Sequence, residues 1–259
     1  MKDRTFGFVG GGRITAIFLE ALGGTGFDLQ RVTVSDSSPG VLAKRKEGFP
    51  AITTTPDNGA AASCDRVFLA LHPPAAKGAL PELAGALGPG AVVVSLAPVL
   101  TFEKLGALLG GFDRLARMIP NAPSIVGAGY NPVAFGDALP ADERAEIETL
   151  LDGLGAHPVV PEETLEAYAI LAAMGPTYFW FQWQELRRLA GSFGLGAAEA
   201  DAALRAKLEG AVRTFFDRGR PYEDVADLVP VKPLADAEPR IRQAYGDALE
   251  GLYRKLTGV

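Results

Sequence analysis

Three consecutive glycines, Gly10 to Gly12, follow a short apolar run and precede a helical pattern. Gly10 would permit a tight turn, and Gly12, which lacks a Cβ, would let a pyrophosphate reach the backbone N–H groups at the start of the helix. The helix dipole favours negative charge there, and Arg13 could add a phosphate contact. Glycines also occur in ordinary turns, and Thr15 stands where Gly or Ala usually lets helix and strand approach. A strand before the turn and a helix after it favour a dinucleotide site.

An acidic residue, Asp36, ends the second strand pattern, 24 residues after Gly12. At this place an acid accepts the adenosine ribose hydroxyls of NAD, and its charge repels the 2′-phosphate of NADP. Ser37 and Ser38 follow it, and hydroxyl groups suit a phosphate, so the choice between NAD and NADP is open. The other interpretation of Asp36 is a turn residue at the start of the segment 36–40, which continues with two serines, a proline and a glycine.

Strand and helix patterns alternate through the first part of the chain and would position these residues. Continuous apolar runs without alternation are typical of a parallel sheet covered on both faces. They occupy residues 65–71 and 90–97, and shorter strand patterns occupy 5–9 and 29–36. Further strand candidates are 50–55, 114–120 and 131–135, with 156–161 as a last edge strand. Helical patterns between them give the doubly wound α/β plan, in which ligands bind beyond the carboxyl ends of the strands.

The chain changes character after Pro161, where no strand signal remains. Helical patterns cover 162–195, with an interruption at Gly175-Pro176, and then 197–219 and 236–256. We therefore expect residues 1–158 to form a Rossmann dinucleotide-binding domain and residues 159–259 to form a smaller, all-helical domain.

Composition narrows the class of partner. The net charge is −6 and no cluster of Lys and Arg stands out, so nucleic acid is not expected as a partner. No apolar run approaches the roughly 18 residues of a membrane span, and the chain starts on a strand pattern without a signal peptide. The single cysteine, Cys64, excludes an intramolecular disulfide and suits a cytoplasmic enzyme, with Cys64 as a buried filler. Two histidines and one cysteine show no metal-ligand spacing.

Several segments together resemble the pyrroline-5-carboxylate reductase family. They include GFVGGGRI, SSPGVLA, VFLALHPP, VVVSLAPVL, RMIPNAPSIVGAGY and EETLEAYAILAAMGPTYFWFQWQEL. The segments RMIPNAPSIVGAG and GPTY are the specific ones, since the glycine turn alone would not separate this family from others. The resemblance implies a Rossmann doubly wound sheet followed by an all-helical dimerisation domain. It also implies hydride transfer from NAD(P)H to the C=N carbon of a cyclic imine acid.

The resemblance carries individual residues over. It implies cofactor contacts at the glycine turn, the ribose segment and three further strand ends, which comprise Gly10, Gly12, Arg13, Ile14, Ser35, Asp36, Ser37, Asn58, Leu71, His72, Pro73, Ser95 and Ala97. Asn121 and Glu162 fall on the family's substrate side. His72 and Ala97 both follow strand ends, which agrees with the expected crevice. The alternatives are a helix-entry position for His72, a turn for Asn121 and a loop cap for Ser95.

The substrate half departs from the family pattern. His72 replaces a lysine, and Ala169 replaces a threonine that could help to deliver a proton. The family's loop SPGGTT gives way to VPVKPLADAEP, at 229–239, whose prolines offer no N–H to a substrate carboxylate. Lys232 could supply a point charge in its place, and Tyr178 could supply a polar group and act as a proton donor. The other interpretation of the aromatic stretch 178–183 is a dimer core, which we favour.

Three functions follow from these observations. The first is an NAD(P)H-dependent reductase of an imine or a related small carbonyl acid, active as a homodimer. A 3-hydroxyacid dehydrogenase ranks lower, because that chemistry needs a lysine in the long helix and AAMGPTYFWFQWQELRR offers none. The third is a nucleotide-binding sensor without turnover, which the altered substrate loop favours somewhat.

Overall fold

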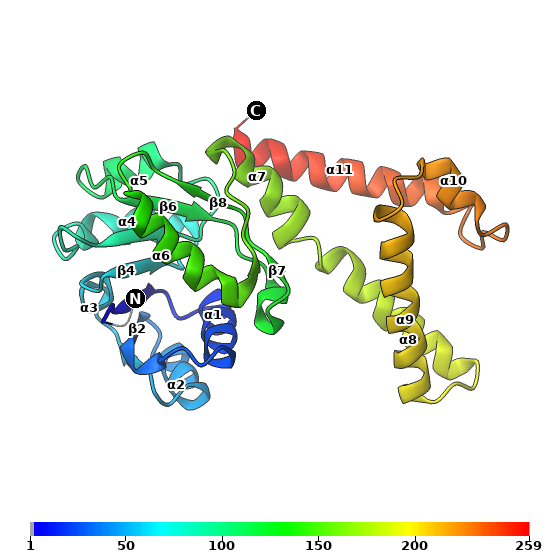
Figure 1. The fold of residues 1–259 in the computed structure, drawn as a ribbon, viewed down its shortest axis with the longest axis horizontal. Coiled ribbons are helices and arrows are strands. Elements are labelled where there is room, and N and C mark those ends of the chain that lie inside the picture. Colours follow the sequence, from blue (N-terminus) through cyan, green and yellow to red (C-terminus); the bar gives the residue numbers. More distant parts are fainter. Residues whose placement is uncertain (1–2, 259) are drawn as a thin grey trace. The chain divides into compact units, whose positions relative to one another are not determined.

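A seven-stranded sheet organises the first part of the chain in the computed structural model, which describes residues 3–258 (Figure 1). Its order is β3-β2-β1-β4-β5-β6-β8. The strands are β1 (Phe6–Val9), β2 (Val32–Ser35), β3 (Thr53–Thr55), β4 (Arg66–Leu69), β5 (Val92–Ser95), β6 (Leu115–Met118) and β8 (Val133–Phe135). The first six are parallel and β8 is antiparallel to β6. The predicted α/β fold class is confirmed, and the chain reverses its strand order between β1 and β4, where such sheets bind ligands.

Helices cover both faces of this sheet, as the continuous apolar strands predicted. On one face α1 (Arg13–Gly24) and α6 (Ala141–Leu151) pack over a core in which the rings of Phe8 and Phe68 stack 4.8 Å apart. On the other face lie α3 (Asn58–Ala62), α4 (Pro73–Leu83) and α5 (Phe102–Leu108). The helix α2 (Pro39–Gly48) connects β2 to β3. Because β1 to β6 run parallel, the loops that follow these strands all lie at one edge of the sheet.

The edge strand predicted at 156–161 is confirmed only in part. Gly155 and Ala156 instead form β9 (Gly155–Ala156), which pairs with β7 (Gly129–Tyr130) in a separate two-stranded sheet. Beyond it, pairing with β8 is reduced to one bridge, between Val133 and Val159. Prolines at 158 and 161 flank that bridge, and their nitrogens cannot donate to a ladder.

The C-terminal part is helical, as predicted. After α7 (Leu165–Tyr168) one π-helical turn runs to Ala173, and the chain breaks before Pro176. The remaining helices are α8 (Thr177–Ser192), α9 (Ala197–Phe216), α10 (Tyr222–Asp227), which the sequence patterns missed, and α11 (Glu238–Thr257). None of the helices described for residues 3–258 is both long and apolar enough to cross a lipid bilayer.

Two compact units divide the chain. The first runs to Met174 and takes in the chain from Tyr253 onward, and the second, the helical unit, is Gly175–Leu252. This division lies later than the boundary expected at 158–159. The reason is packing: Leu165 and Ala169 of the first helical turns are buried in a cluster with Ile119 and Ala134, so these turns belong to the sheet-containing unit.

Candidate cofactor and substrate site

The glycine turn after β1 is held in a conformation that requires its residues. Gly10 has a φ of +105°, and a Cβ there would lie 2.6 Å from the carbonyl oxygen of Ala70. Its N–H donates to the carbonyl of Ser35 (2.8 Å). Thr15, at the position where a small residue was expected, is buried, and its hydroxyl donates to the carbonyl of Gly10 (2.5 Å). Thr15 thus braces the turn through a hydrogen bond.

Asp36 braces the same turn from the neighbouring strand. One oxygen of its carboxylate accepts from the N–H of Gly11 (2.9 Å), and the other accepts from the N–H of Ser38 (2.8 Å). The second bond makes Asp36 a turn residue, as the alternative interpretation expected. The first bond, between residues 25 positions apart, places its charge beside the glycine turn.

The start of α1 fits a diphosphate. Gly12 is the N-cap, no side chain caps the helix, and its first turn carries no acidic residue. A Cβ built on Gly12 would meet no atom within 4 Å, so the backbone faces open space. The first N–H groups of a helix have no intrahelical partner, and together with the dipole they bind anions. Arg13 is exposed beside them, whereas Ile14 packs against the core.

The ribose segment divides between buried and exposed residues. Ser35 is fully buried, and its hydroxyl donates to the side-chain oxygen of Asn58 (2.8 Å) at the start of α3. Ser37 is exposed. Ser35 therefore positions Asn58, while Asp36 and Ser37 remain at the accessible end of β2.

The ends of β4 and β5 lie side by side, because the N–H of Leu96 donates to the carbonyl of Leu69 (3.1 Å). After β4, Leu71 packs against the core, and His72 is exposed as the N-cap of α4 without a capping hydrogen bond from its ring. Pro73 is the first residue of α4. After β5, Ser95 is buried and its hydroxyl accepts from the N–H of Ala97 (3.4 Å), which is the loop cap considered as its alternative. Ala97 is buried as well.

Asn121, after β6, is a buried junction. Its side-chain oxygen accepts from the N–H of Tyr130 (3.2 Å), and its side-chain nitrogen donates to the carbonyl of Ala172 (3.4 Å). Its own N–H donates to the side-chain oxygen of Asn131 (3.1 Å). These bonds tie three segments together, and a contact with substrate stays a prediction.

A buried charge cluster lies beneath this edge, and the sequence patterns missed it. Arg117, on β6, is 1% exposed and donates to Glu162 (2.8 Å) and to Glu166 (2.7 Å). Glu162, predicted at the substrate site, also accepts from the N–H of Phe102 (2.6 Å). An arginine inside the apolar strand pattern 114–120 was the available signal, since a buried guanidinium needs carboxylate partners.

The two remaining predicted site residues, Tyr178 and Lys232, belong to the helical unit. The ring of Tyr178 lies 5.8 Å from that of Tyr245, and burial and the neighbouring Tyr245 raise the pKa of Tyr178. Lys232 lines a cavity of about 480 Å³ together with Tyr222 and Glu238. The roles of both residues stay predictions.

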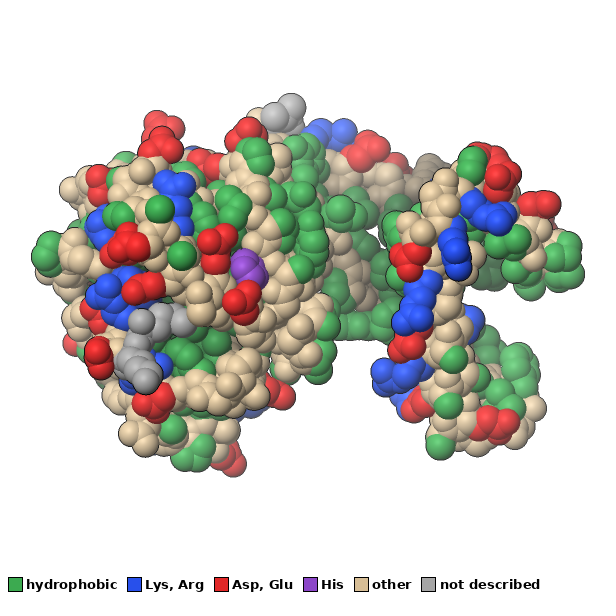
Figure 2. All heavy atoms as spheres, viewed as in Figure 1, with side chains coloured by type: hydrophobic (Ala, Val, Ile, Leu, Met, Phe, Trp, Pro, Cys, Tyr) green, Lys and Arg blue, Asp and Glu red, His purple; other side chains and the backbone are tan. Residues whose placement is uncertain are grey.

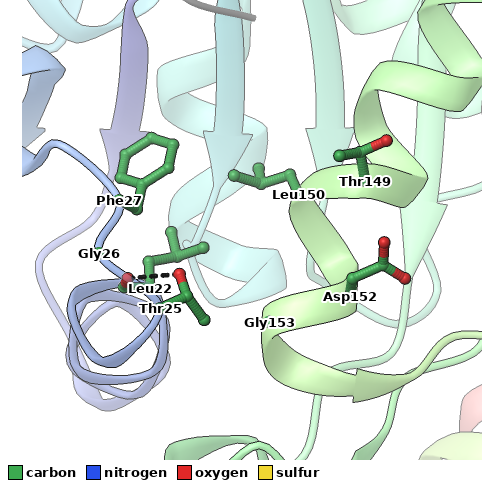
Figure 3. A pocket seen from close by; sticks show the side chains of 8 residues that line it. All are labelled: Leu22, Thr25, Gly26, Phe27, Thr149, Leu150, Asp152 and Gly153. Atoms are coloured by element: carbon green, nitrogen blue, oxygen red, sulfur yellow. Dashed lines mark hydrogen bonds between the residues drawn. The ribbon is translucent and has the colours of Figure 1, made fainter.

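A separate cavity of about 430 Å³ lies where α1 and α6 end (Figure 3). Thr25, whose hydroxyl donates to the carbonyl of Leu22 (2.7 Å), and Asp152 are among its lining residues. Since α1 starts at the carboxyl edge of the sheet and runs back along it, this cavity is at the opposite edge from the glycine turn. Within residues 3–258, no group of three His, Cys, Asp or Glu side chains is placed to hold a metal ion.

Comparisons with known proteins agree with this geometry. Residues 5–98 match the family described as NADP oxidoreductase coenzyme F420-dependent. The chain is 25% identical over 252 residues to the pyrroline-5-carboxylate reductase of Corynebacterium melassecola, covering 96% of this chain and 93% of that protein. It aligns with the structure of the pyrroline-5-carboxylate reductase of Coxiella burnetii over 98% of this chain and 95% of the other, at 26% identity and a TM-score of 0.71.

The fold is also that of the Plasmodium falciparum pyrroline carboxylate reductase, solved with NADP bound. That comparison has a TM-score of 0.84 at 16% identity and covers 100% of this chain and 98% of the other. Sheet order, glycine turn and matched family together define a Rossmann-type NAD(P)-dependent oxidoreductase. Within that class the chain is similar to pyrroline-5-carboxylate reductases, and the similarity extends from the sheet through the C-terminal helices.

Proposed function

We propose that this protein reduces a small cyclic imine acid, or a related carbonyl acid, with NADPH or NADH. The observation that carries the proposal is the open, uncapped glycine turn at the carboxyl edge of the sheet. Similarity to pyrroline-5-carboxylate reductases over 96% of the chain supports the imine as the substrate. When bound, the nicotinamide would supply hydride to the C=N carbon. A proton must also reach the nitrogen to complete the amine.

The protein's own residues would orient the substrate and deliver that proton. We assign proton delivery to His72, which is exposed beside the end of β4, and to the hydroxyl group of Tyr178. Lys232 would attract the substrate carboxylate as a point charge. Asn121 and Glu162 would line the substrate side of the edge through the segments that they hold.

Turnover tests the proposal directly. Purified protein is mixed with NADPH or NADH and with pyrroline-5-carboxylate or a panel of other cyclic imines, and cofactor absorbance is followed. We expect oxidation of the cofactor with at least one imine. Cofactor binding without turnover on every compound would favour the sensor, and oxidation of 3-hydroxyacids with NAD⁺ would favour the dehydrogenase.

The choice of cofactor is proposed to depend on Asp36. Its carboxylate is partly neutralised by two N–H donors, yet its charge stays at the ribose end of the site. Removing that charge in Asp36→Asn should tighten NADPH relative to NADH, by roughly three- to tenfold for about 1 kcal/mol of lost repulsion. Fluorescence titration of both cofactors measures the ratio, with the exposed Asp57→Asn as the control. An unchanged ratio would contradict the assignment.

We further propose a homodimer formed through the helical unit. All of Gly175–Leu252 is described by the structure, and only Gly175 and Ala200 in it are buried. Figure 2 shows hydrophobic side chains on the surface of this unit. Trp180, Phe181 and Phe216 are among the large apolar side chains that are exposed. Exposed apolar area of this kind marks an interface, and a second copy would cover it.

The single thiol of Cys64 supports a cytoplasmic setting.

A further inference from the structure

The loop after β5 contains a strained residue. Val99 has a φ of +74°, and it is the one non-glycine residue with positive φ between residues 3 and 258. A β-branched side chain strongly disfavours this region, so the surrounding structure must hold the backbone there. The loop leaves β5 at Ser95 beside the end of β4, which is the edge where the nicotinamide half of a cofactor is expected.

Charged side chains form hydrogen bonds with the backbone of residues 99–102, which follow β5. The N–H of Val99 donates to Glu166 Oε1 (2.9 Å), and its carbonyl accepts from Lys104 Nζ (3.1 Å). Three residues further on, the N–H of Phe102 donates to Glu162 Oε1 (2.6 Å). Charge-assisted bonds of this kind are stronger than neutral ones.

The buried guanidinium of Arg117 positions the carboxylates of both Glu162 and Glu166. Arg117 Nη1 donates to the same oxygen of Glu162 that holds Phe102, and Nη2 donates to the same oxygen of Glu166 that holds Val99. Arg117 Nε is buried and has no hydrogen-bond partner in the described structure. A valine held at positive φ is unfavourable, and strain of this kind is concentrated at functional sites, which points to a function for the position of this loop.

We propose that Arg117, Glu162 and Glu166 are positioning residues that hold loop 97–102 as a fixed wall beside the nicotinamide end of the cofactor site. The inference rests on the proposed function, because it requires a nicotinamide cofactor at this edge. It predicts that disrupting the cluster weakens the binding of the nicotinamide half of the cofactor and does not change the binding of the adenosine half. It also predicts that glycine at position 99 makes the Glu166 bond dispensable, because glycine adopts positive φ without help.

Binding of two ligands separates these effects. We would titrate NADPH and NADH against wild type, Glu166→Ala, Val99→Gly and the double variant, in parallel with ADP-ribose and its 2′-phosphate, which lack nicotinamide. Glu166→Ala should weaken NAD(P)H about tenfold, as expected for one charge-assisted bond, and leave the ADP-ribose compounds within about twofold. Adding Val99→Gly should restore most of the loss. Glu163→Ala, an exposed neighbour on the same segment, is the matched control.

A second variant covers the case in which Glu166→Ala does not fold. Lys104→Ala removes an exposed contact to the Val99 carbonyl and should weaken NAD(P)H about threefold while sparing ADP-ribose. Equal weakening of both ligand types, or no rescue by Val99→Gly, would overturn the positioning role. If the wild-type protein binds no nucleotide at all, both the proposed function and this inference are wrong. If wild type binds both ligand types and the variants change neither, the inference alone fails.

Discussion

At the residue scale, Gly12 and Gly10 serve the same turn for opposite reasons. Gly10 is surrounded, with the Ala70 carbonyl where a Cβ would go, and its φ is positive. Gly12 has an ordinary φ of −68° and open space in front of it. A side chain at Gly10 disturbs the fold, whereas a side chain at Gly12 disturbs only what binds in front of it.

Gly12→Ala should therefore fold normally and bind NAD(P)H at least about tenfold more weakly, a loss of roughly 1.4 kcal/mol or more. The methyl group occupies the approach of the pyrophosphate, and Gly12→Asp should abolish binding because it adds charge repulsion. Gly24→Ala is the matched control, since a Cβ at that end of α1 also meets no atom within 4 Å. Fluorescence titration and thermal unfolding measure both effects; unchanged affinity in folded Gly12→Ala would refute the assigned turn.

Cys64 is buried, and burial raises the pKa of its thiol. A raised pKa means less thiolate at any given pH, so we expect the native protein to react with a thiol reagent at pH 8 more slowly than the urea-unfolded chain does. Absorbance of the released chromophore gives both rates. Equal rates in the two states would show that the thiol is accessible, contrary to its placement.

Residue types were predictable from the sequence, but their partners were not. The glycine turn and Asp36 each had a local signature, yet the bond from the N–H of Gly11 to Asp36 depends on parallel pairing of Val9 with Ser35. Arg117 finds its carboxylates 45 and 49 positions away. Such pairs follow from the three-dimensional fold, and no local pattern encodes them.

At the scale of elements, α6 is fastened to the sheet by charge as well as by packing. Arg66, on β4, is 2% exposed and pairs with Glu146 of α6, with Glu143 nearby at 3.8 Å. Arg114, beside β6, pairs with Glu143. These contacts lie at the amino ends of the strands, away from the glycine turn.

Arg66→Ala should lower the free energy of unfolding by about 2 kcal/mol, because it removes the charge-assisted hydrogen bond from the buried Arg66 guanidinium to Glu146 and empties the space of a buried side chain. Glu143 keeps its pair with Arg114, and Glu146 keeps its contact with Arg4. Cofactor affinity should not change in the folded fraction. Urea unfolding measures the loss, and Arg242→Ala is the control, since its pair with Glu238 is exposed to solvent and contributes little to stability. Similar losses in the two variants would mean that the Arg66 cluster does not secure α6.

Element types were predicted better than element boundaries. Apolar runs located the parallel strands, and Gly175-Pro176 located the break between helices. The segment 156–161 misled because Val159 and Val160 resemble a strand while the prolines around them prevent a ladder. The first unit extends to Met174, beyond the boundary expected at 158–159, because Leu165 and Ala169 pack against Ile119 and Ala134. Hydrophobicity alone does not show which partners such residues pack against.

At the scale of the whole molecule, the two units differ in how much they bury. The sheet-containing unit has cores on both faces, whereas the helical unit leaves Phe179, Trp180 and Phe181 between 46% and 68% exposed. Within a monomer such area is unfavourable, and a second copy would remove it from water.

Phe181→Glu should convert the proposed dimer largely to monomer, since it places a charge in an apolar interface. Light scattering coupled to size exclusion measures the mass, with the wild type at twice the chain mass. Lys44→Glu, which alters the charge of an exposed residue on α2, should remain dimeric. A monomeric wild type at micromolar concentration would contradict the interface.

The small interior of Gly175–Leu252 also bears on how the protein matures in the cell. In the proposed dimer, the exposed apolar side chains of the helical unit would be covered only after two chains meet, because only Gly175 and Ala200 within that unit are buried. We expect the last stage of biogenesis to be an encounter between two chains. Its rate should rise with the level of synthesis, and chains made at low abundance should wait longest in a form that chaperones and proteases recognise.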